Sequence, residues 1–348
     1  MWFYVVVLVQ KWLRIFVVLL AVASCNSDDN SSGVNSDVNS DPNPQSVTPQ
    51  STSQPPLVCG SAIEPFDPQI FNTPGWHLFV LGDTGKANEA QLIAAQIIES
   101  YHTQYPLDAI IHTGDVFYDD GISSADDILT QTAFADIYTP LGLTDIRWFF
   151  SAGNHDYNGD IQALLQWGDA QPFIVFPELY YQTQINRNRL SFADTVNQSQ
   201  GPSLNLIAID TTPFTSGIGQ AEQLAWLQQQ LANDDARYTL VFGHHPIVSY
   251  GEDGNEEGLQ GNVRALLKQY EVDFYLAGHE HSLQVIDVPD EPVNIVSGAG
   301  GAEITELTCD EQHLFGISQF GGVALYVTQN QVFSIPVSQR GIEGMIRH

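Results

Sequence analysis

The chain has 348 residues, of which 43% are hydrophobic, enough to form a sizeable core in one large domain or two ordinary ones. Its 41 Asp and Glu residues outnumber 11 Lys and Arg residues and give a formal net charge of −30. This charge repels polyanions and leaves no basic surface, which argues against nucleic acid as a partner. We interpret the acidity as a solvated surface that favours solubility.

The first 25 residues are predicted to be an export signal. Lys11 and Arg14 precede the apolar stretch "IFVVLLAVAS", which has the length of a signal peptide and ends in small residues. Residues 22–25, "VASC", resemble the bacterial lipobox, in which the cysteine becomes the lipidated first residue of the mature protein. A plain cleaved signal and an uncleaved anchor are the alternatives, because "MWFYVVVLVQ" makes the segment unusually long. We expect an exported protein of the cell envelope, in the periplasm or at the surface, and favour the lipid-anchored form.

Residues 26–56 are rich in Ser, Asn, Asp, Gln and Pro and cannot bury enough apolar surface to fold, so they are predicted to be a linker. Residues 57–348 contain no repeat and no second low-complexity break, which predicts one domain. Cys59 and Cys309 stand near its two ends. In an oxidising compartment they either form a disulfide or remain two separate buried thiols, and the sequence leaves both alternatives open.

Short apolar runs alternate with helical patterns from residue 76 onward. Strands are expected at 76–82, 107–114, 146–154, 204–210, 238–244 and 272–279, and helices at 87–104, 124–136, 219–232 and 260–270. Residues 173–200 are predicted to form strands and turns, and the tail to form antiparallel strands with a turn at "TQNQ". The alternation predicts an α/β core whose strands are buried on both faces.

Five of these runs end in a glycine followed by polar residues. These residues are Asp83 after "FVLG", Asp115 after "IHTG", Asn154, His155 and Asp156 after "SAG", His244 and His245 after "VFG", and His279 and His281 after "LAG". Open α/β sheets place their ligands beyond the carboxyl ends of the strands, so these tips are expected to converge. Clustered carboxylates would repel one another, and cations would remove that penalty.

The motifs GD, GDxxY, GNHD, a GH followed by Pro, and GHxH resemble those of the calcineurin-like metallophosphoesterases. Within these, the small, single-domain, tartrate-resistant purple acid phosphatases are the most similar, over roughly residues 76–302. The resemblance implies a metallophosphoesterase fold of the α/β class, with two stacked mixed β-sheets flanked by helices in a single domain. It also implies an iron(III) site and a second site for divalent iron, zinc or manganese.

The resemblance assigns the metal ligands residue by residue. The ferric site is expected at Asp83, Tyr118 and His281, and the divalent site at Asn154, His244 and His279, with Asp115 bridging the two. Most of the superfamily has Asp-x-His as its first motif, whereas this chain has Asp83-Thr84-Gly85. Tyr118 is interpreted as the replacement for that histidine, because a phenolate is a hard anion that suits iron(III).

The catalytic residues are expected beside these ligands. A metal-bound hydroxide would attack the phosphorus, and His155 would bind phosphate and protonate the leaving alkoxide. Asp156 either orients His155 or is an ordinary loop carboxylate. His245 either contacts phosphate in the pocket, which we favour, or faces away from the metals. The chain departs from the mammalian-type pattern at Asp253, where a second acid histidine is expected, and at Tyr157, where another imidazole would line the pocket.

These expectations predict an exported acid phosphatase that hydrolyses phosphate monoesters. Its substrates would be small phosphate esters, phosphoproteins or nucleotides. A phosphodiesterase or nucleotide hydrolase on the same dimetal core is the close alternative. A non-catalytic surface lipoprotein that keeps the fold for binding is the alternative from another class, but it predicts degraded ligand positions, and all seven hold ligand-capable residues.

Overall fold

The computed structural model describes residues 57–185, 201–216 and 220–348 of the chain. The expected export signal and linker lie outside these residues, and so do residues 186–200 of the stretch predicted as strands and turns. Among the helices of the described ranges, none combines the length and the apolarity that a membrane crossing requires.

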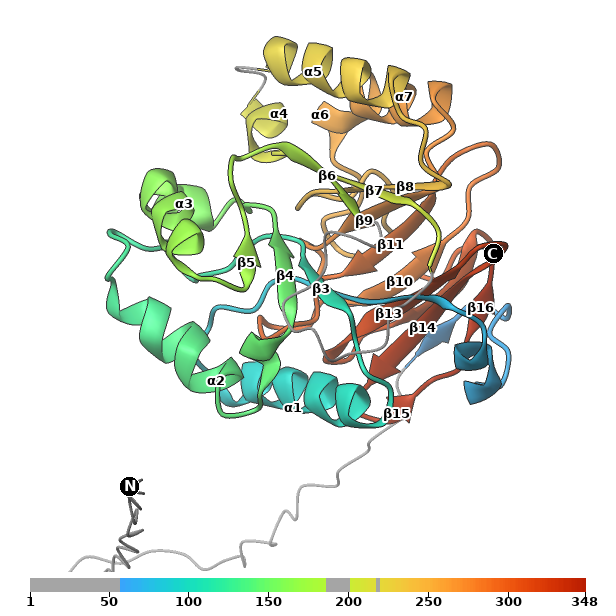
Figure 1. Ribbon diagram of the computed structural model, residues 1–348, viewed down its shortest axis with the longest axis horizontal. Coiled ribbons are helices and arrows are strands. Elements are labelled where there is room, and N and C mark those ends of the chain that lie inside the picture. Colours follow the sequence, from blue (N-terminus) through green and yellow to red (C-terminus); the bar gives the residue numbers. More distant parts are fainter. Residues whose placement is uncertain (1–56, 186–200, 217–219) are drawn as a thin grey trace, which may run out of the picture. The chain divides into compact units, whose positions relative to one another are not determined.

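The described residues contain two mixed β-sheets (Figure 1). The first has the strand order β15-β14-β13-β2-β3-β4-β5, and β16 pairs with β14. Its strands are β2 (Gly75–Leu81), β3 (Ala109–His112), β4 (Arg147–Phe150), β5 (Ile174–Val175), β13 (Gly321–Thr328), β14 (Val332–Ser338), β15 (Gly341–Ile342) and β16 (Ile346–Arg347). Strands β2 to β5 run parallel, and the later strands join antiparallel to β2.

The second sheet has the order β1-β12-β10-β11-β9-β8-β7-β6. Its strands are β1 (Val58–Cys59), β6 (Tyr181–Ile185), β7 (Leu204–Ala208), β8 (Tyr238–Phe242), β9 (Phe274–Ala277), β10 (Leu283–Ile286), β11 (Val293–Ser297) and β12 (His313–Ile317). Strands β7, β8, β9 and β11 are parallel. The predicted fold class, two mixed sheets flanked by helices, is confirmed.

Helices pack beside both sheets (Figure 1). They are α1 (Glu89–Gln104), α2 (Asp136–Tyr138), α3 (Ile161–Ala170), α4 (Thr212–Ser216), α5 (Gln220–Ala232), α6 (Glu257–Gln260) and α7 (Val263–Gln269). Short 3-10 helices span Pro68–Asn72, Leu143–Asp145 and Asp156–Asn158, and a π-helical turn spans Thr130–Ala135. Helix α1 contacts β13 and β14, while α4 to α7 gather over the second sheet, where their apolar side chains form one cluster with those of β7, β8 and β9.

Strands β7 and β8 are buried on both faces, which explains their unbroken apolar runs. In β7, Leu206 packs into the large core that the two sheets share, and its neighbour Ile207 packs under the helices. In β8, Leu240 and Val241 divide in the same way. Successive side chains of a strand point to opposite faces, so a strand covered on both sides needs apolar residues at every position.

The helix predicted over residues 124–136 begins later than expected. Helical structure starts after Asp127, whose carboxylate accepts hydrogen bonds from the backbone N–H groups of Ser123 at 3.0 Å and Leu129 at 3.1 Å. An aspartate at the start of a helix accepts from the N–H groups of the first turn, so Asp127 acts as the helix cap and leaves residues 123–126 in a loop. The sequence interpretation also missed α3, which is capped by Asp160.

A disulfide joins Cys59 to Cys309, which settles the alternative that the sequence left open. It closes a loop with a sequence separation of 250 residues. Long loops gain the most from such a link, so we expect the Cys59→Ser/Cys309→Ser variant to lose about 2–4 kcal/mol of stability. Thermal unfolding should show a midpoint lower by roughly 5–10 °C. Reductant should lower the midpoint of the wild type only; a wild type that reductant leaves unchanged would contradict this expectation.

His77 lies in β2 among aromatic rings and is buried. Its Nδ1 lies 3.1 Å from the carbonyl of Pro106, its Nε2 lies 2.9 Å from the Tyr101 hydroxyl, and burial lowers its pKa to about 3. The unfolded chain binds a proton at this histidine near pH 6.5, whereas the folded chain does not. Stability contributed by neutral His77 is therefore present above pH 6.5 and is lost as the pH falls toward 3.

This proton linkage gives a pH-dependence prediction. Between pH 6 and pH 4, we expect His77→Gln to reduce the slope of unfolding free energy against pH by about 1.4 kcal/mol per unit. Denaturant titrations of both proteins at several pH values measure the two slopes. Equal slopes would show that His77 is protonated in the folded protein.

Candidate metal centre

The parallel strands of both sheets end at one place. Strands β2, β3 and β4 lead into Asp83, Asp115 and Asn154, and strands β8 and β9 lead into His244 and His279. The glycines at these ends permit close approach: a Cβ on Gly278, the residue before His279, would lie 2.3 Å from Oδ2 of Asp83. Only glycine leaves room for that carboxylate. The structure thus brings together the strand tips that the sequence predicted to converge.

Three residues of this region have left-handed backbone conformations. The φ angles are +60° at Asp83, +53° at Asp115 and +67° at His279. Residues other than glycine seldom adopt such angles, and where they do the surrounding structure holds them, often at functional sites. This geometry turns three predicted ligands toward a common centre at a cost in backbone strain.

The first group of donor atoms surrounds the hydroxyl of Tyr118. The Tyr118 side chain is buried. The hydroxyl oxygen lies 2.7 Å from Oδ2 of Asp115, 3.0 Å from Oδ1 of Asp83 and 3.3 Å from Nε2 of His281. Burial and the two carboxylates raise the pKa of Tyr118 well above its usual value. A bound metal cation would reverse that direction by favouring the phenolate.

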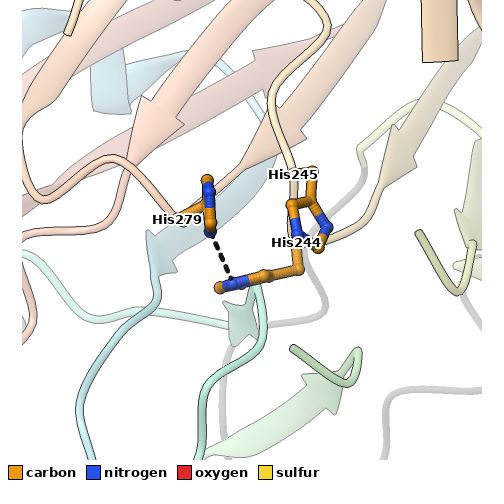
Figure 2. A group of neighbouring side chains, drawn as sticks. All are labelled: His244, His245 and His279. Carbon is orange, nitrogen blue, oxygen red and sulfur yellow. Dashed lines mark hydrogen bonds between the residues drawn. The ribbon is translucent and has the colours of Figure 1, made fainter. Parts of the chain in front are cut away.

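The second group of donor atoms surrounds the amide oxygen of Asn154. Nε2 of His244 lies 2.8 Å from this oxygen and Nδ1 of His279 lies 3.1 Å from it, while the two ring nitrogens are 3.2 Å apart. Figure 2 shows His244 and His279 reaching toward each other from the loops after β8 and β9, with His245 beside them. Imidazole and amide donors of this kind suit a divalent transition metal.

Asp115 connects the two groups. Its Oδ2 lies 2.7 Å from the Tyr118 hydroxyl and 3.4 Å from Nε2 of His244, and the residue is 1% exposed. Burial opposes ionisation, but His244 outweighs it and holds the pKa of Asp115 below its usual range. Burial likewise opposes a charge on His244, yet Asp115 raises its pKa to about 9. The pair marks a place where positive charge is stabilised.

Two predicted ligand histidines have their ring orientation fixed by backbone carbonyls. Nδ1 of His244 lies 2.9 Å from the carbonyl of Thr113, and Nδ1 of His281 lies 2.6 Å from that of Glu303. Since a carbonyl only accepts, each Nδ1 carries the hydrogen, and the neutral ring presents the lone pair of Nε2 to the centre. This arrangement is the one that metal-binding histidines use, so the donor set fits two metal ions.

Gly85 and Tyr118 are linked through the backbone. A Cβ on Gly85 would lie 2.0 Å from the carbonyl oxygen of Val116, and the Gly85 carbonyl accepts a hydrogen bond from the Tyr118 N–H at 3.0 Å. The chain that carries Tyr118 inward therefore occupies the space beside residue 85. A histidine at position 85 would not fit, which supports the interpretation that the tyrosine replaces it.

His155 lies at the edge of the centre. Its backbone N–H donates to Oδ1 of Asp115 at 2.8 Å, and its Nδ1 donates to the carbonyl of Asp119 at 2.6 Å. The ring packs against Tyr118, with 4.3 Å between the ring centroids. The second ring nitrogen, Nε2, has no hydrogen bond among the described residues.

Asp156 has a different environment from the one expected of an orienting residue. Its buried carboxylate accepts hydrogen bonds from the backbone N–H groups of Val116 at 3.0 Å, Phe117 at 3.1 Å and Gly153 at 2.9 Å. Burial and nearby Asp115 raise its pKa to about 7. The Asp119 carbonyl, rather than Asp156, contacts the His155 ring, so Asp156 joins the loops after β3 and β4 instead.

Hydrogen bonds to Glu280 hold the loop of Asp253 next to the centre. The buried carboxylate of Glu280, the residue between His279 and His281, accepts hydrogen bonds from the backbone N–H groups of Asp253 at 2.6 Å and Gly254 at 2.7 Å. Sequence reasoning missed Glu280, although its position inside the GHxH motif was a usable signal.

Lys86 was also missed. Its ammonium lies 4.5 Å from the centroid of the Tyr118 ring and pairs with the carboxylate of Asp119. A lysine directly after Gly85 gives no signal by itself, because the contact depends on where the later loop passes. Lys86 contributes a positive charge at the edge of the donor groups in an otherwise acidic protein.

Comparison with known proteins identifies the family. Residues 77–283 match the calcineurin-like phosphoesterase family. The chain belongs to this family. Tartrate-resistant acid phosphatase type 5 of Rattus norvegicus is 34% identical over 199 residues, which cover 56% of this chain and 61% of that protein. The Mus musculus protein of the same name is 32% identical over 249 residues, covering 66% and 73% respectively.

Solved structures of low identity share the fold. A purple acid phosphatase from yellow lupin seeds superimposes with a TM-score of 0.60 at 16% identity, covering 79% of this chain and 54% of that one. A protein described as the anchor in the inner membrane complex of Plasmodium gives 0.66 at 24% identity, covering 79% and 88%. The expected resemblance to purple acid phosphatases is confirmed, and the phosphoesterase family groups this chain with enzymes that hydrolyse phosphate esters.

Proposed function

We propose that the protein is an exported acid phosphatase that hydrolyses phosphate monoesters at a dimetal centre. The observation that carries this proposal is the position of Asp115, whose Oδ2 lies between the Tyr118 hydroxyl and Nε2 of His244. One carboxylate thereby belongs to both donor groups. A shared carboxylate is how two metals are held close enough to act on one phosphoryl group.

The donor types favour different metals in the two groups. Carboxylate and phenolate oxygens at Asp83 and Tyr118, with His281, suit iron(III), whereas Asn154, His244 and His279 suit divalent iron, zinc or manganese. When bound, the two ions would supply an activated water and polarise the phosphoryl oxygens, and iron(III) would keep that water acidic enough for work at low pH.

His155 is proposed as the general acid. The Asp119 carbonyl accepts its Nδ1–H and fixes the ring, which leaves Nε2 as the nitrogen that exchanges a proton with the substrate. In the imidazolium form, Nε2–H would donate its proton to the ester oxygen as the bond between phosphorus and that oxygen breaks. The product alcohol would leave neutral, and His155 would regain a proton from solvent.

The signal at residues 1–25 and the lipobox-like "VASC" support export with a lipid on Cys25, followed by the linker 26–56 and the phosphoesterase domain 57–348. The acidic surface, with a net charge of −30, favours small substrates over large polyanions.

Two other functions are alternatives to phosphate monoester hydrolysis. A phosphodiesterase or nucleotide hydrolase would use the same donor groups. A non-catalytic surface protein is suggested by the fold shared with a protein named as an anchor. The close packing of the seven ligand-capable residues favours an enzyme, because nothing in an anchoring role requires these donors at 2.7–3.5 Å from one another.

A substrate panel tests the proposal. Purified, metal-loaded protein is assayed from pH 4 to pH 8 with phosphate monoesters, phosphodiesters and nucleoside triphosphates. We expect the highest kcat/KM with monoesters and at acidic pH. Preference for diesters or triphosphates would establish the close alternative, and no turnover of any ester with two metals bound would establish the non-catalytic one.

A further inference from the structure

Thr211 and His245 form a hydrogen-bonded pair behind the second donor group. Thr211 follows β7, and its buried hydroxyl lies 3.2 Å from the backbone nitrogen of His244, 3.0 Å from that of His245 and 2.9 Å from Nδ1 of the His245 ring. A hydroxyl has one hydrogen to donate and two lone pairs to accept with. All three capacities are therefore in use.

The hydrogens of these contacts can be assigned from the chemistry of the groups. The two backbone N–H groups only donate, so they occupy both lone pairs of the Thr211 oxygen. The remaining contact must then use the hydroxyl hydrogen, which Thr211 donates to Nδ1 of His245. Nδ1 is consequently an acceptor, and the hydrogen of the neutral His245 ring is on Nε2.

This arrangement is the reverse of that in His244, where Nδ1 carries the hydrogen because it meets a carbonyl. His244 thus presents a lone pair to the centre, as a metal ligand must, whereas His245 presents an N–H group. The ligand atoms of His244, His245 and His279 lie within 4.8 Å of one another, so distance alone would allow His245 as a third ligand of the divalent metal. The hydrogen assignment argues against it.

The His245 ring lies beside the centre and has a free donor. Its ring packs 4.4 Å from that of His279 between centroids, and Figure 2 shows it beside the two ligand histidines. The residue is 3% exposed, yet Nε2 has no hydrogen bond among the described residues and is not one of the fully enclosed unpaired atoms. Because Nε2 is not fully enclosed, a ligand oxygen can reach it and accept its hydrogen bond.

We propose that His245 is a phosphate-binding residue, whose Nε2–H donates a hydrogen bond to a phosphoryl oxygen of the substrate on the His279 side of the centre. The inference rests on the proposed phosphatase function and adds a contact supplied by the protein rather than by a metal. Such a donor would bind phosphate in substrate and product alike. Its loss should therefore weaken binding more than it slows the chemical step.

The experiment uses the full metal-loaded protein and its His245→Phe and His245→Gln variants. Competitive inhibition gives the inhibition constant of inorganic phosphate, and calorimetry gives its affinity. We expect His245→Phe to keep its metal content, to raise KM and the inhibition constant of phosphate about tenfold or more, and to change kcat less. His245→Gln keeps an N–H donor, so its phosphate affinity should lie between those of the wild type and of His245→Phe. Thermal unfolding verifies that each variant is folded.

Each outcome decides a separate question. Loss of one metal equivalent in both variants would show that His245 is a ligand, and unchanged phosphate binding with two metals would show that its ring faces away; either result overturns the inference. Wild-type protein that binds two metals but neither binds phosphate nor turns over an ester would overturn the proposed function, and the inference with it. Weaker phosphate binding by variants that keep two metals, together with an active wild type, supports both the inference and the proposed function.

Discussion

Asp115→Asn should remove most of the phosphatase activity, by about a thousandfold or more, together with at least one metal ion. The neutral amide lacks the negative charge that both donor groups share at this position, where Oδ2 lies 2.7 Å from Tyr118 and 3.4 Å from His244. Removing several kcal/mol of electrostatic stabilisation from the transition state corresponds to a rate loss of this size. Metal analysis and kcat/KM measure the two effects.

Asp169→Asn is the matched control. It makes the same chemical change at an exposed residue of α3 and should alter neither metal content nor activity. An Asp115→Asn protein that holds two metals and keeps activity within tenfold of the wild type would contradict the bridging assignment.

His155→Ala should lower kcat by about a hundredfold to ten-thousandfold while both metals stay bound. The ring lies next to Tyr118, but its Nδ1 is used by the Asp119 carbonyl, and it belongs to neither donor group. If His155 protonates the leaving group, the loss should be large for alkyl phosphates and small for nitrophenyl phosphate, whose leaving group needs no proton. Comparison of the two substrates measures this difference.

His102→Ala removes a partly buried histidine from the last turn of α1 and should leave kcat unchanged. Equal losses of the His155→Ala protein with both substrates would show that His155 binds phosphate without acting as an acid, and loss of a metal would make it a ligand.

The sequence predicted where the site lies better than it predicted the hydrogen bonds between the residues of the site. Glycine at the end of each buried strand, followed by Asp, Asn or His, located the ligands, because the carboxyl ends of parallel strands must meet at one edge of a sheet. Spacing could not show where a carboxylate points: Asp156 follows His155 directly, yet its side chain turns to the backbone N–H groups of the loop after β3.

Contacts between distant segments were beyond the sequence for the same reason. Thr211 follows β7, a strand predicted correctly, but nothing in "LNLIAID" shows that the next hydroxyl meets His245. The Cys59–Cys309 pairing required a distance that only the folded sheets set. Gly85 is another case. The carbonyl oxygen of Val116 approaches so closely that residue 85 has no room for a side chain.

The visible absorption spectrum of the iron-loaded protein, recorded beside that of Tyr118→Phe with metal analysis of both, tests the central claim most directly. The Tyr118 hydroxyl lies within 3.0 Å of two carboxylates and 3.3 Å from Nε2 of His281, so we expect a purple charge-transfer band between its phenolate and iron(III) that disappears in the variant. A wild type that is colourless with two divalent metals bound and no iron, or a band that Tyr118→Phe leaves intact, would contradict the assignment of Tyr118 as the residue that selects iron(III).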